Sequence, residues 1–205
     1  MIIKKIAKMC RKQGTILSLY KNNTLWAGTN AAVYALNGLP YMSGEQIAVS
    51  FDFSEKVKKN TYYADGEVYD LPIGQESSWD LEVAEPERTV VNGEDVRIFR
   101  HDEKIIFCAE DYFEPLQDLS EDVGLRYALR EWKGATLVAV RSGLILVALI
   151  LPMSICPETL KKWCDQQRKL ILDIEDYSVQ IAEELERRER ENADDGQYTM
   201  EEDEE

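Results

Sequence analysis

Residues 135–151, ATLVAVRSGLILVALIL, decide the fold of this chain. Two runs of apolar, β-prone residues flank the short polar turn Arg141-Ser142-Gly143, which is the pattern of a β-hairpin. The second run, residues 144–151, is apolar on both faces of a strand. Such a run indicates a central strand that is covered on both sides, or a strand at a subunit interface.

The same succession of strand, polar turn and strand occurs twice earlier in the chain. One hairpin is predicted over residues 15–27 and another over residues 95–109. Single strands are predicted at 30–36 and 126–132. A short helix is predicted at 45–52 or at 54–59.

Two longer helices are predicted towards the ends of the chain. In residues 2–12, apolar side chains recur at three- and four-residue steps, with lysine and arginine on the opposing side. Pro157 suits the first position of a second helix, which can continue to about Glu191. Together the elements predict an α+β fold, in which antiparallel β-hairpins pack with an N-terminal helix and a long C-terminal helix follows.

The composition divides the chain into three parts. Residues 1–155 are predicted to form the hairpin domain, with an acidic insertion of one short strand at about 61–94. Residues 156–191 form the long helix. Residues 192–205 are acidic and contain few apolar residues, so they are predicted to be a disordered tail.

Charge is distributed unevenly along the chain. The net charge is −15, yet residues 1–44 hold six basic side chains and no acidic one. An acidic total excludes generic binding of nucleic acid by the whole surface, because a polyanion is repelled unless a local basic face dominates. The predicted N-terminal helix offers one such face. The candidate DNA-binding residues are Lys4, Lys5, Lys8, Arg11 and Lys12. Alternatively, these cations interact with the acidic insertion or the acidic tail of the protein itself.

No motif for catalysis or cofactor binding is present. The sequence lacks phosphate-binding glycine loops and a nucleophile elbow. Its single histidine, His101, falls in a predicted turn, which is a poor place for a general base. The four cysteines have no paired spacing, which argues against a zinc site and favours reduced thiols. We therefore expect a cytoplasmic protein that is not an enzyme, with no metal, cofactor or membrane partner.

The predicted C-terminal helix carries a heptad pattern. Apolar residues fall at alternating three- and four-residue steps once Gln167 and Ser178 are admitted as polar members. The outer part of such a helix projects, frays or pairs with another chain, so a homo-oligomer or a partner protein is expected. The candidate interface residues are Leu160, Cys164, Ile171, Ile174, Ile181 and Leu185.

Three stretches resemble a domain of the DNA sliding clamps, the processivity factors of replicative polymerases. Residues 6–29 are similar to a clamp's inner helix and the strand-turn-strand segment after it. Residues 134–153, GATLVAVRSGLILVALILPM, are similar to the hairpin that ends a bacterial clamp domain. The basic face of residues 2–12 would match the helices that line a clamp's DNA channel. A bacterial clamp subunit has three such domains, whereas this chain has room for one.

Two functions follow from these expectations. The chain as a whole resembles small proteins of phages and mobile elements of Gram-positive bacteria, which implies a clamp-like, non-enzymatic binding or adaptor protein in DNA metabolism. The alternative is a protein–protein interaction module that acts through the long helix and acidic tail, with no nucleic-acid role. An enzyme with an unrecognised site is a third reading, which a deep pocket of convergent polar groups would favour.

Overall fold

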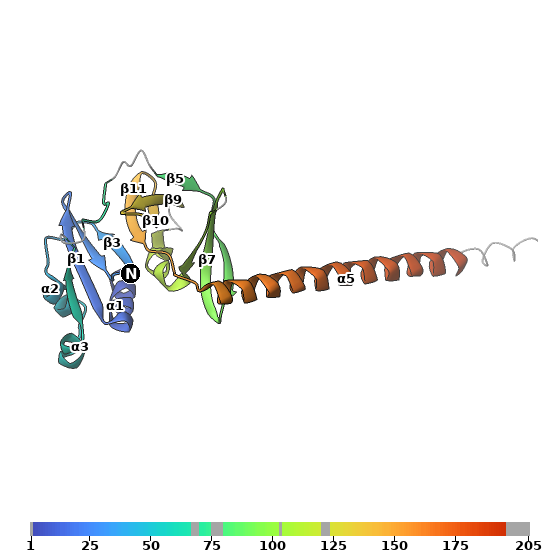
Figure 1. Cartoon of the computed structure of the whole chain (residues 1–205), viewed down its shortest axis with the longest axis horizontal. Helices are drawn as coiled ribbons and strands as arrows, with labels where there is room; N and C mark the ends of the chain where they lie inside the picture. The colour runs from blue at the N-terminus through green and yellow to red at the C-terminus, as the bar shows by residue number, and fades with distance from the viewer. Residues whose placement is uncertain (1, 67–69, 75–79, 103, 120–123, 196–205) are drawn as a thin grey trace, which may run out of the picture. The chain divides into compact units, whose positions relative to one another are not determined.

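A computed structural model of the chain describes residues 2–66, 70–74, 80–102, 104–119 and 124–195. These residues form an α+β fold with antiparallel hairpins, an N-terminal helix and a long C-terminal helix, which confirms the predicted fold class (Figure 1). The chain divides into two compact units, residues 1–155 and residues 156–205. We call the first of them the α+β unit. No helix in the described part of the chain is long and apolar enough to cross a membrane.

The helices of the α+β unit are α1 (Ile2–Gln13), α2 (Gly44–Ser50) and α3 (Glu55–Lys59), with the short 3-10 helices η1 (Glu110–Tyr112) and η2 (Glu114–Leu116). Its strands are β1 (Thr15–Lys21), β2 (Thr24–Gly28), β3 (Ala32–Leu36), β4 (Tyr62–Asp65), β5 (Leu81–Val83), β6 (Glu87–Val91), β7 (Glu94–His101), β8 (Lys104–Ala109), β9 (Leu125–Trp132), β10 (Ala135–Ser142) and β11 (Ile145–Ile150). The second unit contains α5 (Pro157–Asp195).

The large sheet has two similar halves. Its strand order is β4-β1-β2-β3-β11-β10-β9-β5. In one half α1 precedes three antiparallel strands, and in the other half η1 and η2 precede three antiparallel strands. The halves meet where β3 pairs with β11, with Val33 opposite Leu149. Strand β11 is therefore central, as its apolar residues on both faces predict.

The hairpin predicted over residues 95–109 belongs to a second, smaller sheet. Strands β7 and β8 form it, and β6 adds to its edge in the order β6-β7-β8. Phe99 of β7 is fully buried and joins the core on the α1 side of the large sheet. The small sheet is thus part of the same α+β unit.

Both faces of the large sheet are covered. On one face Ile6 and Cys10 of α1 pack with Ile47 of α2 and with alternate side chains of the strands. On the other face a separate apolar cluster includes Trp26 and Leu149. Successive side chains of a strand point to opposite faces, so both cores draw on the same strands.

Residues 70–74, which we call the strap, cover the second face. They lie between β4 and β5, which form the two opposite edges of the sheet. Ile73 of the strap is 3% exposed and packs in the second apolar cluster. All five carbonyl groups of the strap accept hydrogen bonds from side chains, namely Asp70 from Trp132 (3.0 Å), Leu71 from Lys21 (3.4 Å), Pro72 from Arg130, Ile73 from Asn22 (3.3 Å) and Gly74 from Arg130 (3.1 Å).

A buried ion-pair cluster anchors the end of this segment. The guanidinium of Arg130 donates two hydrogen bonds to the carboxylate of Asp80, at 2.7 and 2.6 Å. Arg141 donates a third at 2.5 Å. Burial alone would raise the pKa of Asp80, but the bonds from the two arginines outweigh it and hold the pKa below its usual range. The charged carboxylate is therefore the stable form in the folded protein.

The acidic insertion contains more structure than the sequence predicts. We expect one short strand in residues 61–94, whereas the structure has three strands there, β4, β5 and β6. These strands lie at sheet edges, and most of the described residues of β5 and β6 are exposed. An edge strand is held mainly by backbone hydrogen bonds, so its side chains carry little apolar periodicity. We expect one short helix, at 45–52 or at 54–59, whereas the structure has a helix at each place, α2 and α3.

The long helix continues past its predicted end. Helix α5 begins at Pro157, as expected, and runs to Asp195 rather than to about Glu191. Residues 192–195 are predicted as part of a disordered tail but are helical, and residues 196–205 of that tail lie outside the described residues.

Candidate functional site

Helix α1 is amphipathic, and its apolar side fixes the direction of its basic side. Ile6, Met9 and Cys10 are buried against the large sheet. Burial of the Cys10 thiol raises its pKa to about 12, so this thiol is protonated at neutral pH. The lysines and Arg11 consequently point away from the sheet.

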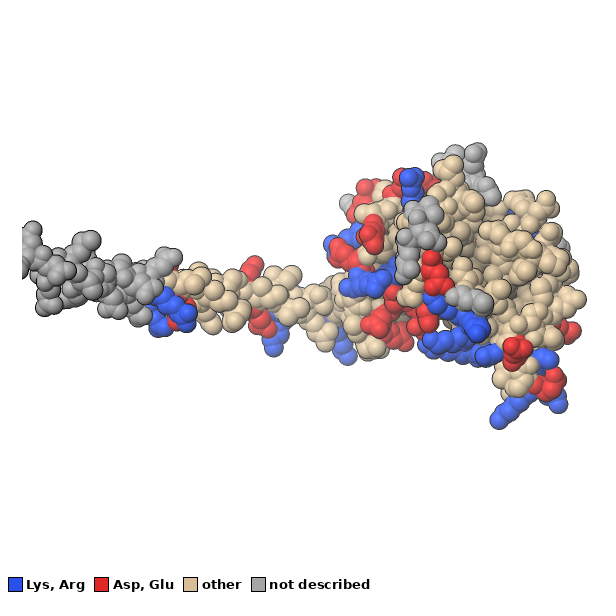
Figure 2. Space-filling model, turned by 180° about the vertical axis from the view of Figure 1, so that it is seen from behind, with Lys and Arg blue, Asp and Glu red and all other residues tan. Residues whose placement is uncertain are grey.

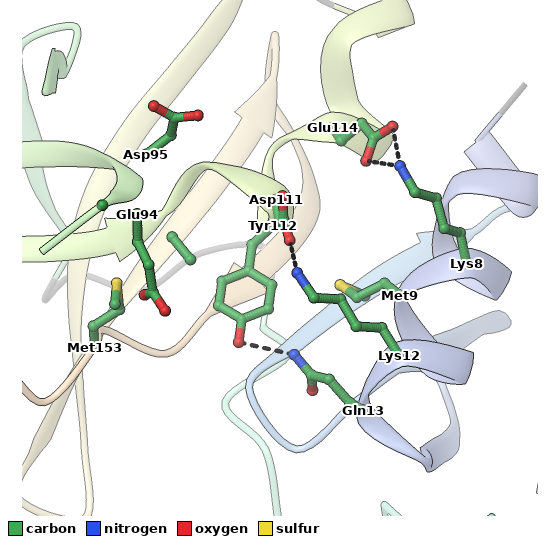
Figure 3. A pocket seen from close by; sticks show the side chains of 12 residues that line it. Lys8, Met9, Lys12, Gln13, Glu94, Asp95, Asp111, Tyr112, Glu114 and Met153 are labelled. Carbon is green, nitrogen blue, oxygen red and sulfur yellow. Dashed lines mark hydrogen bonds and ion pairs between the residues drawn. The ribbon is translucent and has the colours of Figure 1, made fainter. Parts of the chain in front are cut away.

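Three of these lysines form ion pairs with carboxylates of the segment around η1 and η2. Lys5 lies 2.9 Å from Asp118, Lys8 lies 3.1 Å from Glu114, and Lys12 lies 2.5 Å from Asp111. Figure 3 shows the Lys8 and Lys12 pairs, which come from neighbouring turns of α1. The bond to Asp111 raises the pKa of Lys12, even though its side chain is 71% exposed.

Arg11 and Lys4 complete the basic face. The guanidinium of Arg11 donates hydrogen bonds to the carbonyl oxygens of Phe51 and Asp52, at the end of α2, and lies 4.8 Å from the ring centre of Phe53. Carbonyl groups at a helix C-terminus carry partial negative charge and suit a cation. Lys4 is exposed and has no ion pair with another described residue.

The basic face of α1 is therefore largely neutralised by the chain itself. Of its five cations, three contact carboxylates and one contacts carbonyl oxygens. Figure 2 shows the same mixing on a wider scale, with acidic and basic side chains side by side on one face of the α+β unit. A surface of this kind lacks the uniform positive potential that attracts a phosphate backbone.

A cavity of about 410 Å³ lies beside these ion pairs (Figure 3). α1 lines it with Lys8, Met9, Lys12 and Gln13, and the opposite wall includes Glu94 and Tyr112. Gln13 donates a hydrogen bond of 2.9 Å to the Tyr112 hydroxyl. The described lining of the cavity is mostly charged. It contains two lysines and four carboxylates, and two of these carboxylates are ion-paired with the lysines, Glu114 with Lys8 and Asp111 with Lys12.

The described residues contain no cluster of side chains that could bind a metal ion. No group of three or more histidine, cysteine, aspartate or glutamate side chains is placed to hold a metal ion there. His101 lies at the end of β7, 3.7 Å from Asp102, and is partly exposed.

A second buried arginine joins the two sheets. Arg97 of β7 donates hydrogen bonds of 2.6 and 2.8 Å to Glu110, and one of 3.2 Å to the Tyr127 hydroxyl of β9. Its guanidinium also lies 4.2 Å from the ring centre of Phe113. The side chain of Arg97 is 8% exposed, and three of its N–H groups bond to these partners, which is the arrangement of a structural residue.

Helix α5 exposes the predicted interface residues from Cys164 onward, whereas Leu160 is only partly exposed. Every large apolar side chain between Leu170 and Leu185 is more than two-fifths exposed. In heptad notation, the a positions are Cys164, Ile171, Ser178 and Leu185, and the d positions are Leu160, Gln167, Ile174 and Ile181. The g positions Leu170 and Tyr177 widen the apolar stripe on the same side.

Comparison of the chain with protein-family models, with curated proteins and with solved structures gave no match. The likeness to a sliding-clamp domain therefore stays a prediction from the sequence. The structure contains the order of elements on which that likeness rests, namely helix, hairpin and further strand, with a closing hairpin of β10 and β11.

One feature of the candidate sites has no signal in the sequence. The carboxylate partners of the α1 lysines lie 99 to 113 residues away along the chain. Asp111 and Glu114 are ordinary surface acids when the sequence is taken alone. In contrast, the heptad positions of α5 follow from local spacing. Those from Ile171 onward are exposed, whereas Leu160 and Gln167 are only partly exposed.

Proposed function

We propose that this protein is a non-enzymatic adaptor that associates with itself through α5. The observation that carries the proposal is the exposed heptad face of a 39-residue helix. An isolated helix with such a face leaves apolar side chains in water, and pairing with a like helix removes them from it. The adaptor would then present two or more copies of the α+β unit.

The size of the face is sufficient for a specific interface. Burying one isoleucine or leucine side chain contributes about 1.5–3 kcal/mol, which corresponds to roughly 60–120 Å² at about 25 cal/mol per Å². Two such helices, each with six large apolar side chains, would bury on the order of 1,000 Å². Those side chains are Leu170, Ile171, Ile174, Tyr177, Ile181 and Leu185. An area of this order is that of a specific protein–protein contact.

Two neighbouring residues provide a matched test. Ile171 occupies an a position and is 56% exposed, whereas Leu172 occupies a b position and is 52% exposed. Under the proposal Ile171→Lys abolishes self-association of the full chain in light scattering after size exclusion, and Leu172→Lys leaves it unchanged. Equal effects of the two changes would show that association is non-specific. If the unmodified chain is a monomer in this measurement, the proposal is wrong.

The free thiols fit a reducing compartment. Cys10 and Cys108 are buried and unpaired, and Cys156 and Cys164 are exposed. Free thiols of this kind support a compartment that keeps thiols reduced, and we propose the cytoplasm for the adaptor.

A clamp-like protein associated with DNA is the second candidate. The observation that favours it is the exposure of Lys4, together with the largely exposed side chains of Lys8 and Lys12. A phosphate group could replace a carboxylate at an exposed ion pair at little cost, since such pairs contribute about 0–1 kcal/mol. Filter binding of duplex DNA at low salt tests this candidate separately from self-association.

A further inference from the structure

We infer that two copies of α5 pair in antiparallel orientation, in a register that places residue i of one copy opposite residue 345 − i of the other. This inference rests on the proposed self-association. It adds the direction of the partner helix and the residues that meet, neither of which the heptad pattern decides by itself.

The a and d positions of α5 have nearly the same order of residue types whether they are followed from the N-terminal or the C-terminal end of the helix. In the inferred register each a residue meets a d residue of the partner. The layers pair Leu160 with Leu185, Cys164 with Ile181, Gln167 with Ser178 and Ile171 with Ile174. The two polar core residues thus meet each other, and each apolar core residue meets a residue of its own kind or a thiol. A buried polar residue is least costly when it meets a polar partner.

Other antiparallel registers lose this match. A shift of one heptad in one direction places Gln167 opposite Ile171 of the partner. The same shift in the other direction places Gln167 opposite Leu185. Either change buries an amide against an apolar side chain, so the polar pair selects a single register.

The flanking positions distinguish antiparallel from parallel pairing. In antiparallel pairs e positions lie beside e positions, so Arg168 meets Glu175 of the partner twice by symmetry. Both side chains are exposed, and neither has an ion pair with a described residue of its own chain. In parallel pairs g positions lie beside e positions, and Glu175 would instead meet the apolar Leu170. Opposite charges across the interface favour the antiparallel arrangement.

The g positions support the same direction. Antiparallel pairing places Leu170 beside Tyr177 of the partner, and these side chains are 53% and 64% exposed in the single chain. Parallel pairing would place Tyr177 beside the small Ala182. The antiparallel pair therefore buries more apolar surface at its flanks.

The inferred pair has a functional consequence. Residue 157 of one copy lies opposite residue 188 of the other, so the first residues of the two helices stand about 46 Å apart along the shared axis. The protein would be a two-fold symmetric, bivalent adaptor that holds two attachment points at a set spacing. Bivalent presentation raises the avidity for a partner with repeated binding sites.

Disulfide trapping in the full chain tests the direction and the register. Cys156→Ser removes the other exposed thiol, and Ile181→Cys adds a thiol opposite Cys164 of the partner. Mild oxidation, digestion and mass spectrometry then identify the linked peptides. The inference expects a linkage between residues 164 and 181 of different copies, and none in the Cys156→Ser chain that keeps Ile181. A linkage between two copies of Cys164, or a dimer with no linkage, overturns the inference and leaves the proposed self-association standing.

A charge exchange provides a second test that does not depend on thiol geometry. Arg168→Glu places like charges together at both e positions, and we expect it to weaken dimerisation roughly five- to thirty-fold. Adding Glu175→Arg restores opposite charges and should return the dimer dissociation constant to near that of the unmodified chain. Arg168 and Glu175 are seven residues apart on one helix and are not neighbours there, so rescue reports contact between copies. Failure of the rescue contradicts the antiparallel register.

Discussion

Replacement of Asp80 by alanine should destabilise the α+β unit by about 3–5 kcal/mol, the cost of removing one partner from a buried ion pair. The side chain of Asp80 is 8% exposed and that of Arg130 is 2% exposed. Without the carboxylate, the guanidinium of Arg130 keeps its bonds to Pro72 and Gly74, but its charge has no neutralising partner. Arg141 loses the same partner. The strap would then be held less firmly over the second face of the sheet.

Urea unfolding of the full chain measures this cost. For a change of 3–5 kcal/mol and a denaturant dependence of about 2 kcal/mol per molar urea, the midpoint should fall by roughly 1.5–2.5 M. The control is Glu131→Ala, because Glu131 forms an exposed pair with Lys104 at 3.2 Å, and such a pair contributes about 0–1 kcal/mol. Equal shifts for the two variants would refute the argument that burial makes Asp80 important.

The remaining predictions concern pH, thiols, DNA and a helix cap. The pKa of Asp80 is lower in the folded protein than its ordinary value of 3.8, so its contribution to the free energy of unfolding is complete above pH 3.8 and is lost as the pH falls through the folded value. The stability difference between the unmodified chain and Asp80→Asn should therefore shrink in acid. Burial raises the pKa of Cys10 and Cys108 to about 12. An aromatic disulfide reagent at neutral pH should therefore modify the exposed Cys156 and Cys164 quickly, and should modify Cys10 and Cys108 only when the protein unfolds. Replacing the five cations of α1 by glutamine should leave DNA retention on filters unchanged at about 50 mM salt, and a large loss would favour the DNA-associated candidate instead. Ser43→Ala removes the N-terminal cap of α2 and should cost about 1 kcal/mol in the same urea assay; no change would show that the cap is dispensable.

The sequence predicts the elements that carry strong local periodicity. Residues 144–151 are apolar on both faces, and β11 is the central partner of β3 and β10. The steps of three and four residues from Leu160 to Leu185 lie within a continuous helix, with the interface positions from Ile171 onward exposed. In both cases the information is contained in neighbouring residues, so it can be read without the fold.

Features that depend on distant residues could not be predicted in the same way. The strap has no strand pattern, because its carbonyl groups bond to side chains such as Trp132 and Arg130 rather than to a neighbouring strand. The charge of α1 suggests a DNA-binding face until the fold brings Asp111 and Glu114 beside Lys12 and Lys8. Net charge along a segment therefore did not reveal the charge of the surface.

Sedimentation equilibrium of the unmodified chain tests the central claim most directly. A chain of 23.6 kDa that pairs through α5 should sediment at micromolar concentrations with a mass of about 47 kDa, that of a closed two-fold dimer. The mass should return to that of a single chain for Ile171→Lys and remain that of a dimer for Leu172→Lys. A mass of 23.6 kDa for the unmodified chain, at concentrations up to those of concentrated stocks, would contradict the account.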